Sequence, residues 1–274
     1  MKSLRFTYKM QMFFETPISN HHFTLRCFPP SDGWQTILGE NVEIYPNHFI
    51  CNQTDSFSNH CMYGKAMIPH THFSVEVSGT AQVFGTNPIE LDDGMESVFK
   101  FPTKLTQCGA NLKAFYEKII KSPPEEEKCM NLSESFSSLS NFQKAELFMN
   151  SIFNAFKYLQ GVTGVFTTAE EAFSLGQGVC QDYAHILLAL CRKARIPCKY
   201  VVGMMIGEGA THAWVEVFEK GKWLSLDPTH KRLADDTYIV LSRGRDAQDC
   251  SINQGLFTGG GKQTQKVSVL VEER

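Results

Sequence analysis

Residues 176–185 have the sequence Gly-Gln-Gly-Val-Cys-Gln-Asp-Tyr-Ala-His, in which a glycine turn leads into a helix at a cysteine. The two glycines let the backbone turn tightly, and the residues after Cys180 carry apolar side chains at helical spacing. We therefore expect a buried helix that begins near Cys180 and continues to Cys191. The start of a helix offers unpaired N–H groups and the positive end of its dipole, which favour a thiolate. Cys180 is thus either a nucleophile or a small buried side chain.

A strand and a hairpin follow this helix. The apolar pattern predicts strands over 198–206, 211–218 and 223–227, with a turn at 219–222 and a stop at Pro228. If Glu219 faces Lys222 across a two-residue loop, four aliphatic residues share one face of the hairpin. That face is the expected core side, and its residues are Val215, Val217, Leu224 and Leu226.

The other face of the same hairpin carries a candidate dyad. In this register Asp227 lies opposite Trp214 and diagonal to His212. Diagonal neighbours lie roughly 7–8 Å apart between backbones, close enough for a carboxylate to meet an imidazole. A strand histidine paired with an aspartate can also be a purely structural hydrogen bond. The presence of Cys180 favours catalysis, because nucleophile, base and orienting carboxylate are then all available.

The chain resembles the transglutaminase-like superfamily, in the bacterial branch whose members are classed as candidate cysteine proteases. The resemblance is carried by residues 178–185, 212–217 and 226–229, and extends through 158–172 and 244–260. A β-rich leading domain of that branch resembles residues 6–78. The resemblance implies a papain-like core in which the nucleophile helix packs on an antiparallel sheet. One departure is Ala247-Gln248, where relatives tend to have an aromatic residue and a serine.

The implied activity is thiol-dependent acyl transfer by Cys180, His212 and Asp227, and we expect a cysteine protease or amidase. Hydrolysis of a peptide, isopeptide or side-chain amide bond is preferred, because no Asp-x-Asp-x-Asp-Gly calcium loop is evident. The alternatives are amide-to-amine transfer, as in a transglutaminase, and a noncatalytic binding module on the same fold. Gln177 is a candidate donor to the oxyanion, and Trp214 a candidate shield for the dyad; either could be packing alone.

Composition limits the partners and the compartment. A net charge of −3 with scattered Lys and Arg gives no reason to expect nucleic acid. Nine irregularly spaced cysteines argue against a disulfide framework. With no apolar leader and no run of membrane-spanning length, we expect a cytoplasmic protein that acts on a peptide or protein substrate. The histidines at 21–22 and 70–72 lack zinc-site spacing, so we expect neither a metal nor a cofactor.

The chain divides at about residue 100 into two expected domains. Proline- and asparagine-rich turns in residues 1–100 predict an antiparallel β-sandwich-like domain, and residues 101–274 form the transglutaminase-like core, giving an α+β fold. Helices are expected at 115–120 and 142–156, with a surface linker at 123–128. On the second helix the apolar residues should pack in the core rather than bind a partner, and they are Phe142, Leu147, Ile152, Phe153 and Phe156.

The C-terminal part of the chain is expected to complete the core. Strands at 237–242 and 266–271 should extend the core sheet, and the glycine-rich loop at 244–261 should rim the cleft. Arg245 and Asp246 could fix that loop as an ion pair.

Overall fold

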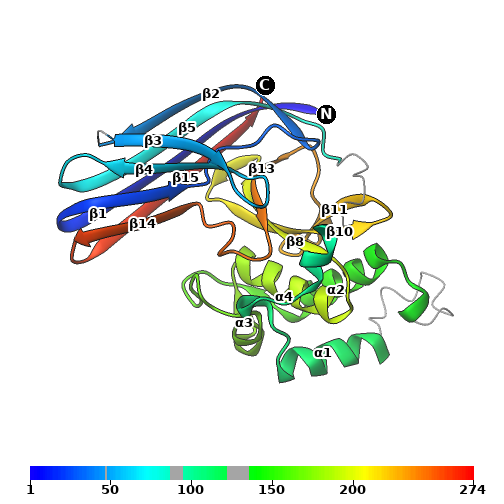
Figure 1. The fold of residues 1–274 in the computed structure, drawn as a ribbon. Helices are drawn as coiled ribbons and strands as arrows, with labels where there is room; N and C mark the ends of the chain where they lie inside the picture. The colour runs from blue at the N-terminus through cyan, green and yellow to red at the C-terminus, as the bar shows by residue number, and fades with distance from the viewer. Residues whose placement is uncertain (47, 87–94, 122–135) are drawn as a thin grey trace.

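The computed structural model describes residues 1–46, 48–86, 95–121 and 136–274. Two antiparallel sheets and a group of helices make up this part of the chain (Figure 1). The α+β class and the papain-like core expected from the sequence are confirmed. Asn87-Pro88, one of the turns expected in residues 1–100, and the linker expected at 123–128 lie outside the described residues.

The first sheet is a curled, eight-stranded antiparallel layer built around one very long strand, β1 (Lys2–Leu25). Buried and exposed side chains alternate along the first half of β1, as expected for a strand with one covered face. A register shift between Ser19 and His22 marks where β1 bends toward other partners. The remaining strands are β2 (Gln35–Tyr45), β3 (His48–Thr54), β4 (His60–Ala66), β5 (His70–Val83), β9 (Gly207–Gly209), β14 (Asn253–Gly259) and β15 (Gln263–Glu273).

Both ends of the chain contribute to this first sheet. Strand β15 pairs with β1 from Leu4 opposite Glu273 to Phe14 opposite Gln263, so the expectation that 266–271 would extend the core sheet is wrong. The expected loop at 244–261 is also partly a strand, because β14 pairs with the second half of β1. The first sheet therefore also needs strands from the C-terminal end of the chain. The domain boundary expected near residue 100 stays a prediction.

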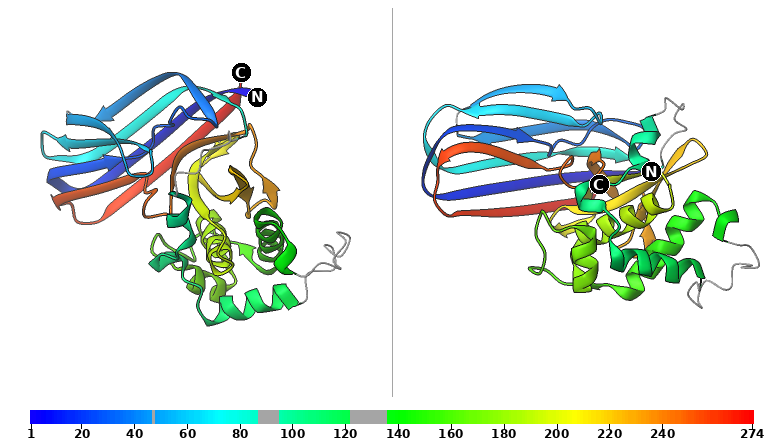
Figure 2. Two further views of the ribbon diagram at one scale, coloured as in Figure 1. Left: turned by 45° about the vertical axis from the view of Figure 1, so that its right-hand side comes forward. Right: turned by 60° about the horizontal axis from the view of Figure 1, so that its bottom comes forward.

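The second sheet has the order β12-β11-β10-β8-β13, and helices cover one of its faces (Figure 2). Its strands are β8 (Cys198–Met205), β10 (His212–Glu219), β11 (Lys222–Asp227), β12 (Arg232–Leu233) and β13 (Tyr238–Gly244). The helices are α1 (Ala110–Lys121), α2 (Asn141–Ala155), α3 (Ala169–Leu175) and α4 (Cys180–Lys193), of which α2 and α4 pack on β10. A short parallel pair, β6 (Lys157–Tyr158) and β7 (Gln177–Gly178), and the 3-10 turns Met95–Lys100, Lys104–Thr106 and Phe136–Ser138 complete the described elements.

The predicted hairpin register is confirmed. Glu219 pairs with Lys222, and the two pairs of aliphatic residues oppose each other as expected. Lys220 and Gly221 have φ of 51° and 79°, the left-handed conformation of a tight two-residue hairpin turn. The sequence predicted one core side for this hairpin. Its other face is buried as well, because Trp214 and Asp227 on that face are fully buried.

The second face is buried because the first-sheet part of the chain docks on β13. The Trp34 indole donates a hydrogen bond to the carbonyl of Tyr238 at 2.8 Å. The Gln35 side chain bonds both the N–H and the carbonyl of Val240, each at 2.8 Å. These side-chain contacts hold the two sheets together. One face of the core sheet is therefore covered by helices and the other by the first-sheet part of the chain.

The predicted capped helix over 142–156 is α2. Ser140 caps it and accepts a hydrogen bond from the N–H of Gln143, whose side chain bonds back to Ser140. Leu147, Ile152 and Phe156 are buried as expected. Phe153 is 41% exposed, so its expected place in the core is wrong. The segment expected to be helical at 115–120 lies within α1.

Candidate active site

Cys180 is the first residue of α4, as the glycine-to-helix pattern predicts, and it is half-buried. Val179 is the N-cap, and its N–H donates to the Asp182 carboxylate at 2.7 Å. The same carboxylate oxygen accepts a hydrogen bond from the Thr163 hydroxyl at 2.7 Å. Asp182 therefore caps the helix and ties the preceding loop to the turn that holds Cys180.

His212 begins β10 and joins the other two candidate residues. Its Nε2 lies 2.8 Å from Oδ2 of Asp227, and the Cys180 side chain is its second polar partner. Because Nε2 is engaged, Nδ1 is the ring nitrogen left for the sulfur. Burial opposes a charge on this ring, but the bonds to Asp227 and Cys180 outweigh it and raise the pKa of His212 to about 9. The site therefore favours an imidazolium at neutral pH.

Asp227 ends β11, is fully buried, and accepts hydrogen bonds at both carboxylate oxygens. Oδ2 accepts from His212, from Nδ1 of His230 at 2.7 Å and from the Tyr238 hydroxyl at 2.8 Å. Oδ1 accepts from the backbone N–H of Thr229 at 2.9 Å and of His230 at 3.3 Å. Burial disfavours the carboxylate, but these bonds and the nearby histidines hold its pKa well below the usual range.

The sequence reasoning missed two of these partners, His230 and Tyr238. A signal for His230 was present, because Asp-Pro-Thr-His predicts a turn that brings the backbone two and three residues after the aspartate back to its carboxylate. Tyr238 lies on β13, which does not neighbour β11 in the sheet order. Its contact with Asp227 follows from strand order, which local pattern does not reveal.

Of the two residues expected to support the site, Trp214 packs on His212, and Gln177 precedes Cys180 in the chain. Trp214 is fully buried, and its ring stacks on that of His212 with centroids 6.3 Å apart. Gly203 faces His212 in β8, and a Cβ there would lie 2.5 Å from the Trp214 ring. The indole therefore fits only because this residue is a glycine. Gln177 is half-buried in β7, three residues before Cys180, and its role as an oxyanion donor stays a prediction.

Two histidines and Asp227 lie close enough together to be considered as metal ligands. Possible ligand atoms of His212, Asp227 and His230 all lie within 4.8 Å of one another. At 2.8 Å and 2.7 Å, however, both ring nitrogens are at hydrogen-bonding distance from one carboxylate oxygen. Those contacts need protons on the nitrogens, which a metal ligand must lose. The present arrangement therefore suits hydrogen bonding.

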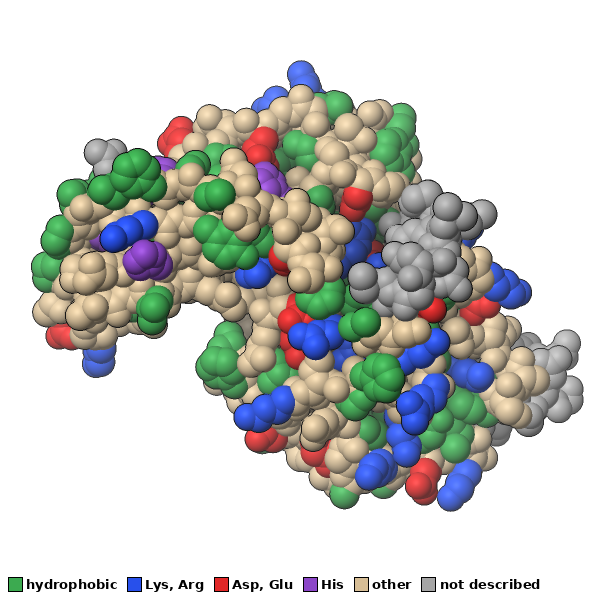
Figure 3. Space-filling view, in the orientation of Figure 1, with side chains coloured by type: hydrophobic (Ala, Val, Ile, Leu, Met, Phe, Trp, Pro, Cys, Tyr) green, Lys and Arg blue, Asp and Glu red, His purple; other side chains and the backbone are tan. Residues whose placement is uncertain are grey.

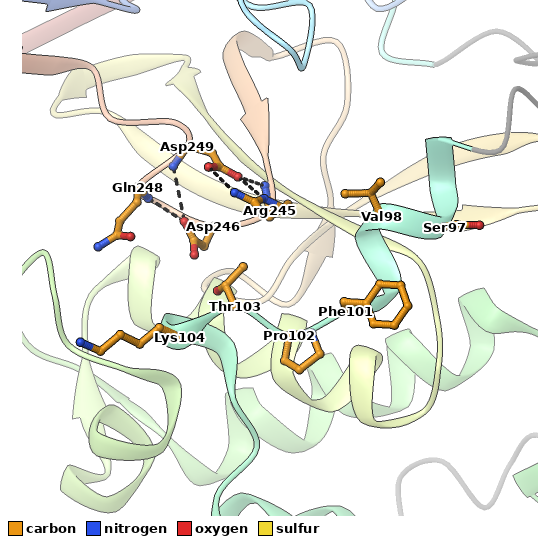
Figure 4. Close-up of a pocket in the computed structure, with 10 residues that line it drawn as sticks. All are labelled: Ser97, Val98, Phe101, Pro102, Thr103, Lys104, Arg245, Asp246, Gln248 and Asp249. Atoms are coloured by element: carbon orange, nitrogen blue, oxygen red, sulfur yellow. Dashed lines mark hydrogen bonds and ion pairs between the residues drawn. The ribbon is translucent and has the colours of Figure 1, made fainter.

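A pocket of about 500 Å³ lies elsewhere, between residues 97–104 and the loop at 245–249 (Figure 4). Cys180, His212 and Asp227 are not among the residues that line it. Arg245 pairs with Asp249 at 2.8 Å, and not with Asp246 as the sequence suggested. Asp246 accepts the N–H of Gln248 at 2.9 Å, so an Asx-type turn shapes the loop.

In the view of Figure 3, Lys and Arg side chains on the helical part alternate with acidic and apolar ones. Among the described helices, none combines the length and apolar character needed to cross a bilayer.

Comparisons with known proteins place this geometry in a family. The model of the transglutaminase-like superfamily matches residues 131–228, and that of the bacterial transglutaminase-like N-terminal region matches residues 4–82. An uncharacterised protein of Mycobacterium leprae is 24% identical over 95% of both chains. One of Mycobacterium tuberculosis is 36% identical over 43% of both chains.

A solved structure shares the whole fold. It is a candidate cysteine protease from Cytophaga hutchinsonii, with a TM-score of 0.77 and 22% identity, covering 99% of this chain and 90% of that one. At this identity the likeness establishes the fold alone, and the two family matches carry the assignment. The chain belongs to the transglutaminase-like superfamily and carries the N-terminal region of its bacterial branch.

Proposed function

We propose that this protein is a thiol-dependent acyl-transfer enzyme that hydrolyses a peptide, isopeptide or side-chain amide bond. Cys180 is the nucleophile, His212 the acid and base, and Asp227 the group that orients His212. The observation that carries the proposal is that His212 lies between two partners, the Cys180 side chain and the buried Asp227 carboxylate. The family supplies the precedent for thiol chemistry on this fold.

The chemistry follows from where the protons sit. The Cys180 thiolate attacks the amide carbon, and the C–N bond breaks as His212 gives its proton to the departing amine. The acyl group is then held as a thioester. A water molecule attacks this thioester, His212 takes up a water proton, and the thiolate leaves with the acid product free. Asp227 stabilises the imidazolium and stays ionised throughout.

Helix α4 contributes to the oxyanion as well as to the thiolate. Backbone N–H groups in its first turn lie at the positive end of the helix dipole, beside the sulfur that bonds the substrate carbon. The Cys180 N–H is the first candidate donor, and the Gln177 amide is the second. Trp214, stacked on His212, would keep water from the imidazolium.

Two other functions remain candidates. If an amine replaces water in the second half-reaction, the same site performs amide-to-amine transfer, as in a transglutaminase. A noncatalytic binding module would keep the fold without a reactive thiol. Hydrolysis is preferred on the sequence argument that no Asp-x-Asp-x-Asp-Gly calcium loop is evident. The substrate class is peptide or protein in either case.

Thiol reactivity tests the proposal without a known substrate. The protein is treated with limiting iodoacetamide at pH 6–7, and adducts at each cysteine are followed by mass spectrometry. Cys180 should react faster than Cys51, an exposed cysteine that serves as the matched control. The His212→Ala variant should slow the reaction at Cys180 and leave that at Cys51 unchanged.

A Cys180 that reacts no faster than Cys51 would contradict the proposed mechanism and favour the binding module. Peptide amides with and without a primary amine then separate the two enzymes. Release of acid product alone supports hydrolysis, and incorporation of the amine supports transfer. Cys180→Ala should abolish both.

We also propose a cytoplasmic location. All eight described cysteines are free thiols, as expected in a reducing compartment. Cell fractionation with an antibody to the chain tests this, and recovery in an extracytoplasmic fraction would contradict it.

A further inference from the structure

His230 holds the Asp227 carboxylate with two separate N–H groups. Its ring Nδ1 lies 2.7 Å from Oδ2, and its backbone N–H donates to Oδ1 at 3.3 Å. The residue follows β11 through a turn made by Pro228 and Thr229, which brings it back over the strand end. The Asp227 side chain is fully buried and that of His230 is 44% exposed, so His230 covers the carboxylate from the solvent side.

The direction of the ring hydrogen bond is fixed by its partner. An ionised carboxylate only accepts, so Nδ1 of His230 must carry the hydrogen. The same holds for Nε2 of His212, which bonds the same oxygen. With the Tyr238 hydroxyl at 2.8 Å, three donors surround Oδ2. Three donors from different directions leave the carboxylate little freedom to rotate away from His212.

The ring of His230 also lies close to the candidate base. The centroids of the His212 and His230 rings are 5.0 Å apart, at an interplanar angle of 49°. This contact raises a simpler explanation, in which His230 matters only as a flat ring that packs on His212. The two explanations differ in what the side chain must supply, because one needs a donor and the other needs ring volume.

We propose that His230 is a positioning residue for the thiol site: its Nδ1–H group holds Asp227 ionised and aimed at His212. The inference rests on the proposed function, since it concerns the carboxylate that orients the candidate base. It assigns His230 no contact with the substrate. Its effect on Cys180 passes through Asp227 and His212 in turn.

Two substitutions at position 230 show whether the site needs the N–H donor of His230 or the volume of its ring. His230→Asn keeps an N–H group near the position of Nδ1 and removes most of the ring, whereas His230→Phe keeps the ring and removes the donor. We expect the phenylalanine variant to alkylate at Cys180 about 10- to 100-fold more slowly at pH 7, the factor for a lost hydrogen bond to a charged group. The asparagine variant should stay within about threefold of the native rate.

The controls make the result decisive. Lys231→Gln, at the next position, should leave the rate unchanged, and melting temperatures show whether each variant is folded. Equal rates for native protein and the phenylalanine variant would overturn the proposal. So would an asparagine variant as slow as the phenylalanine variant, because a donor alone would then not suffice. Failure of the proposed function differs from both, since native Cys180 itself would then be no faster than Cys51.

Discussion

His212 in the core sheet and His21 in the first sheet are both buried, but the pKa of His212 is raised and that of His21 is lowered. His212 is 7% exposed and faces a carboxylate, and its pKa is raised to about 9. His21 is 2% exposed, and its Nδ1 lies 3.2 Å from Nε2 of His70. Burial and the neighbouring His70 lower the pKa of His21 to about 4. The partner, and not the depth of burial, therefore decides which ring is charged.

The environment of His21 explains why it stays neutral. Nδ1 of His70 lies 2.8 Å from the carbonyl of Ile68, which only accepts, so neutral His70 presents a lone pair at Nε2. Nδ1–H of His21 donates to that lone pair. Phenylalanine rings surround the pair, including Phe73 with its centroid 4.7 Å from that of His21. A second proton would be buried there without a counter-charge.

Removing the charge of Asp227 should make His212 behave like His21. Asp227→Asn keeps the shape of the side chain but leaves His212 buried without a carboxylate, as His21 is. We expect the pKa of His212 to fall below its usual range and turnover to fall by about 10⁴-fold, the loss typical of a triad carboxylate. NMR titration of the His212 ring measures the first effect, and hydrolysis of a peptide amide measures the second.

Asp249→Asn is the matched control, because Asp249 pairs with Arg245 away from the triad. It should change neither the His212 titration nor the Cys180 rate. A His212 that still titrates near pH 9 in the Asp227→Asn variant would show that the carboxylate does not set its charge.

The two histidine regions also differ in how tightly a neighbouring glycine is packed. A Cβ at Gly203 would lie 2.1 Å from the carbonyl oxygen of Ile239 and 2.5 Å from the Trp214 ring. A Cβ at Gly255 would meet no atom closer than Nε2 of His21, at 3.1 Å. We expect Gly203→Ala to lower the free energy of unfolding by about 3 kcal/mol and Gly255→Ala by less than about 1 kcal/mol. Urea denaturation checks this order, and equal losses would contradict it.

Acid stability tests the neutral histidine directly. Because the folded-state pKa of His21 lies below its unfolded value, unfolding takes up a proton, and stability falls as pH drops from about 6.5 toward 4. His21→Gln keeps a donor for His70 and cannot titrate. It should reduce the pH dependence of the unfolding free energy over this range by about 1–3 kcal/mol.

Part of this pH dependence must survive the substitution. Burial also lowers the pKa of His185 in α4 to about 4, so that residue continues to contribute. His212 contributes with the opposite sign, because its raised pKa makes the imidazolium's stabilisation present below about 6.5 and lost as pH rises through about 9. A flat profile between pH 4 and 9 in the native protein would contradict both assignments.

Local pattern predicted the elements and faces that depend on near neighbours in the chain. The helix start at Cys180, the hairpin register and the His212–Asp227 contact all follow from spacing within about 16 residues. Partners set by the order of strands could not be found in this way. Tyr238 reaches Asp227 from β13, and β15 joins β1 across almost the full length of the chain. Phe153 was misplaced because an aromatic residue on a helix need not face the core.

The exposed ion pair of Arg245 and Asp249 should matter far less than the buried pair of His212 and Asp227. Arg245 and Asp249 pair through two bonds, at 2.8 and 3.1 Å, but the arginine side chain is 44% exposed. Asp249→Asn should lower the free energy of unfolding by about 0.5 kcal/mol in low salt, and this loss should vanish in 1 M NaCl. The pKa of His212 should stay near 9 in the same salt, because solvent ions do not reach a pair in which Asp227 is fully buried. A His212 titration as sensitive to salt as the Asp249 effect would mean that the site is open to solvent.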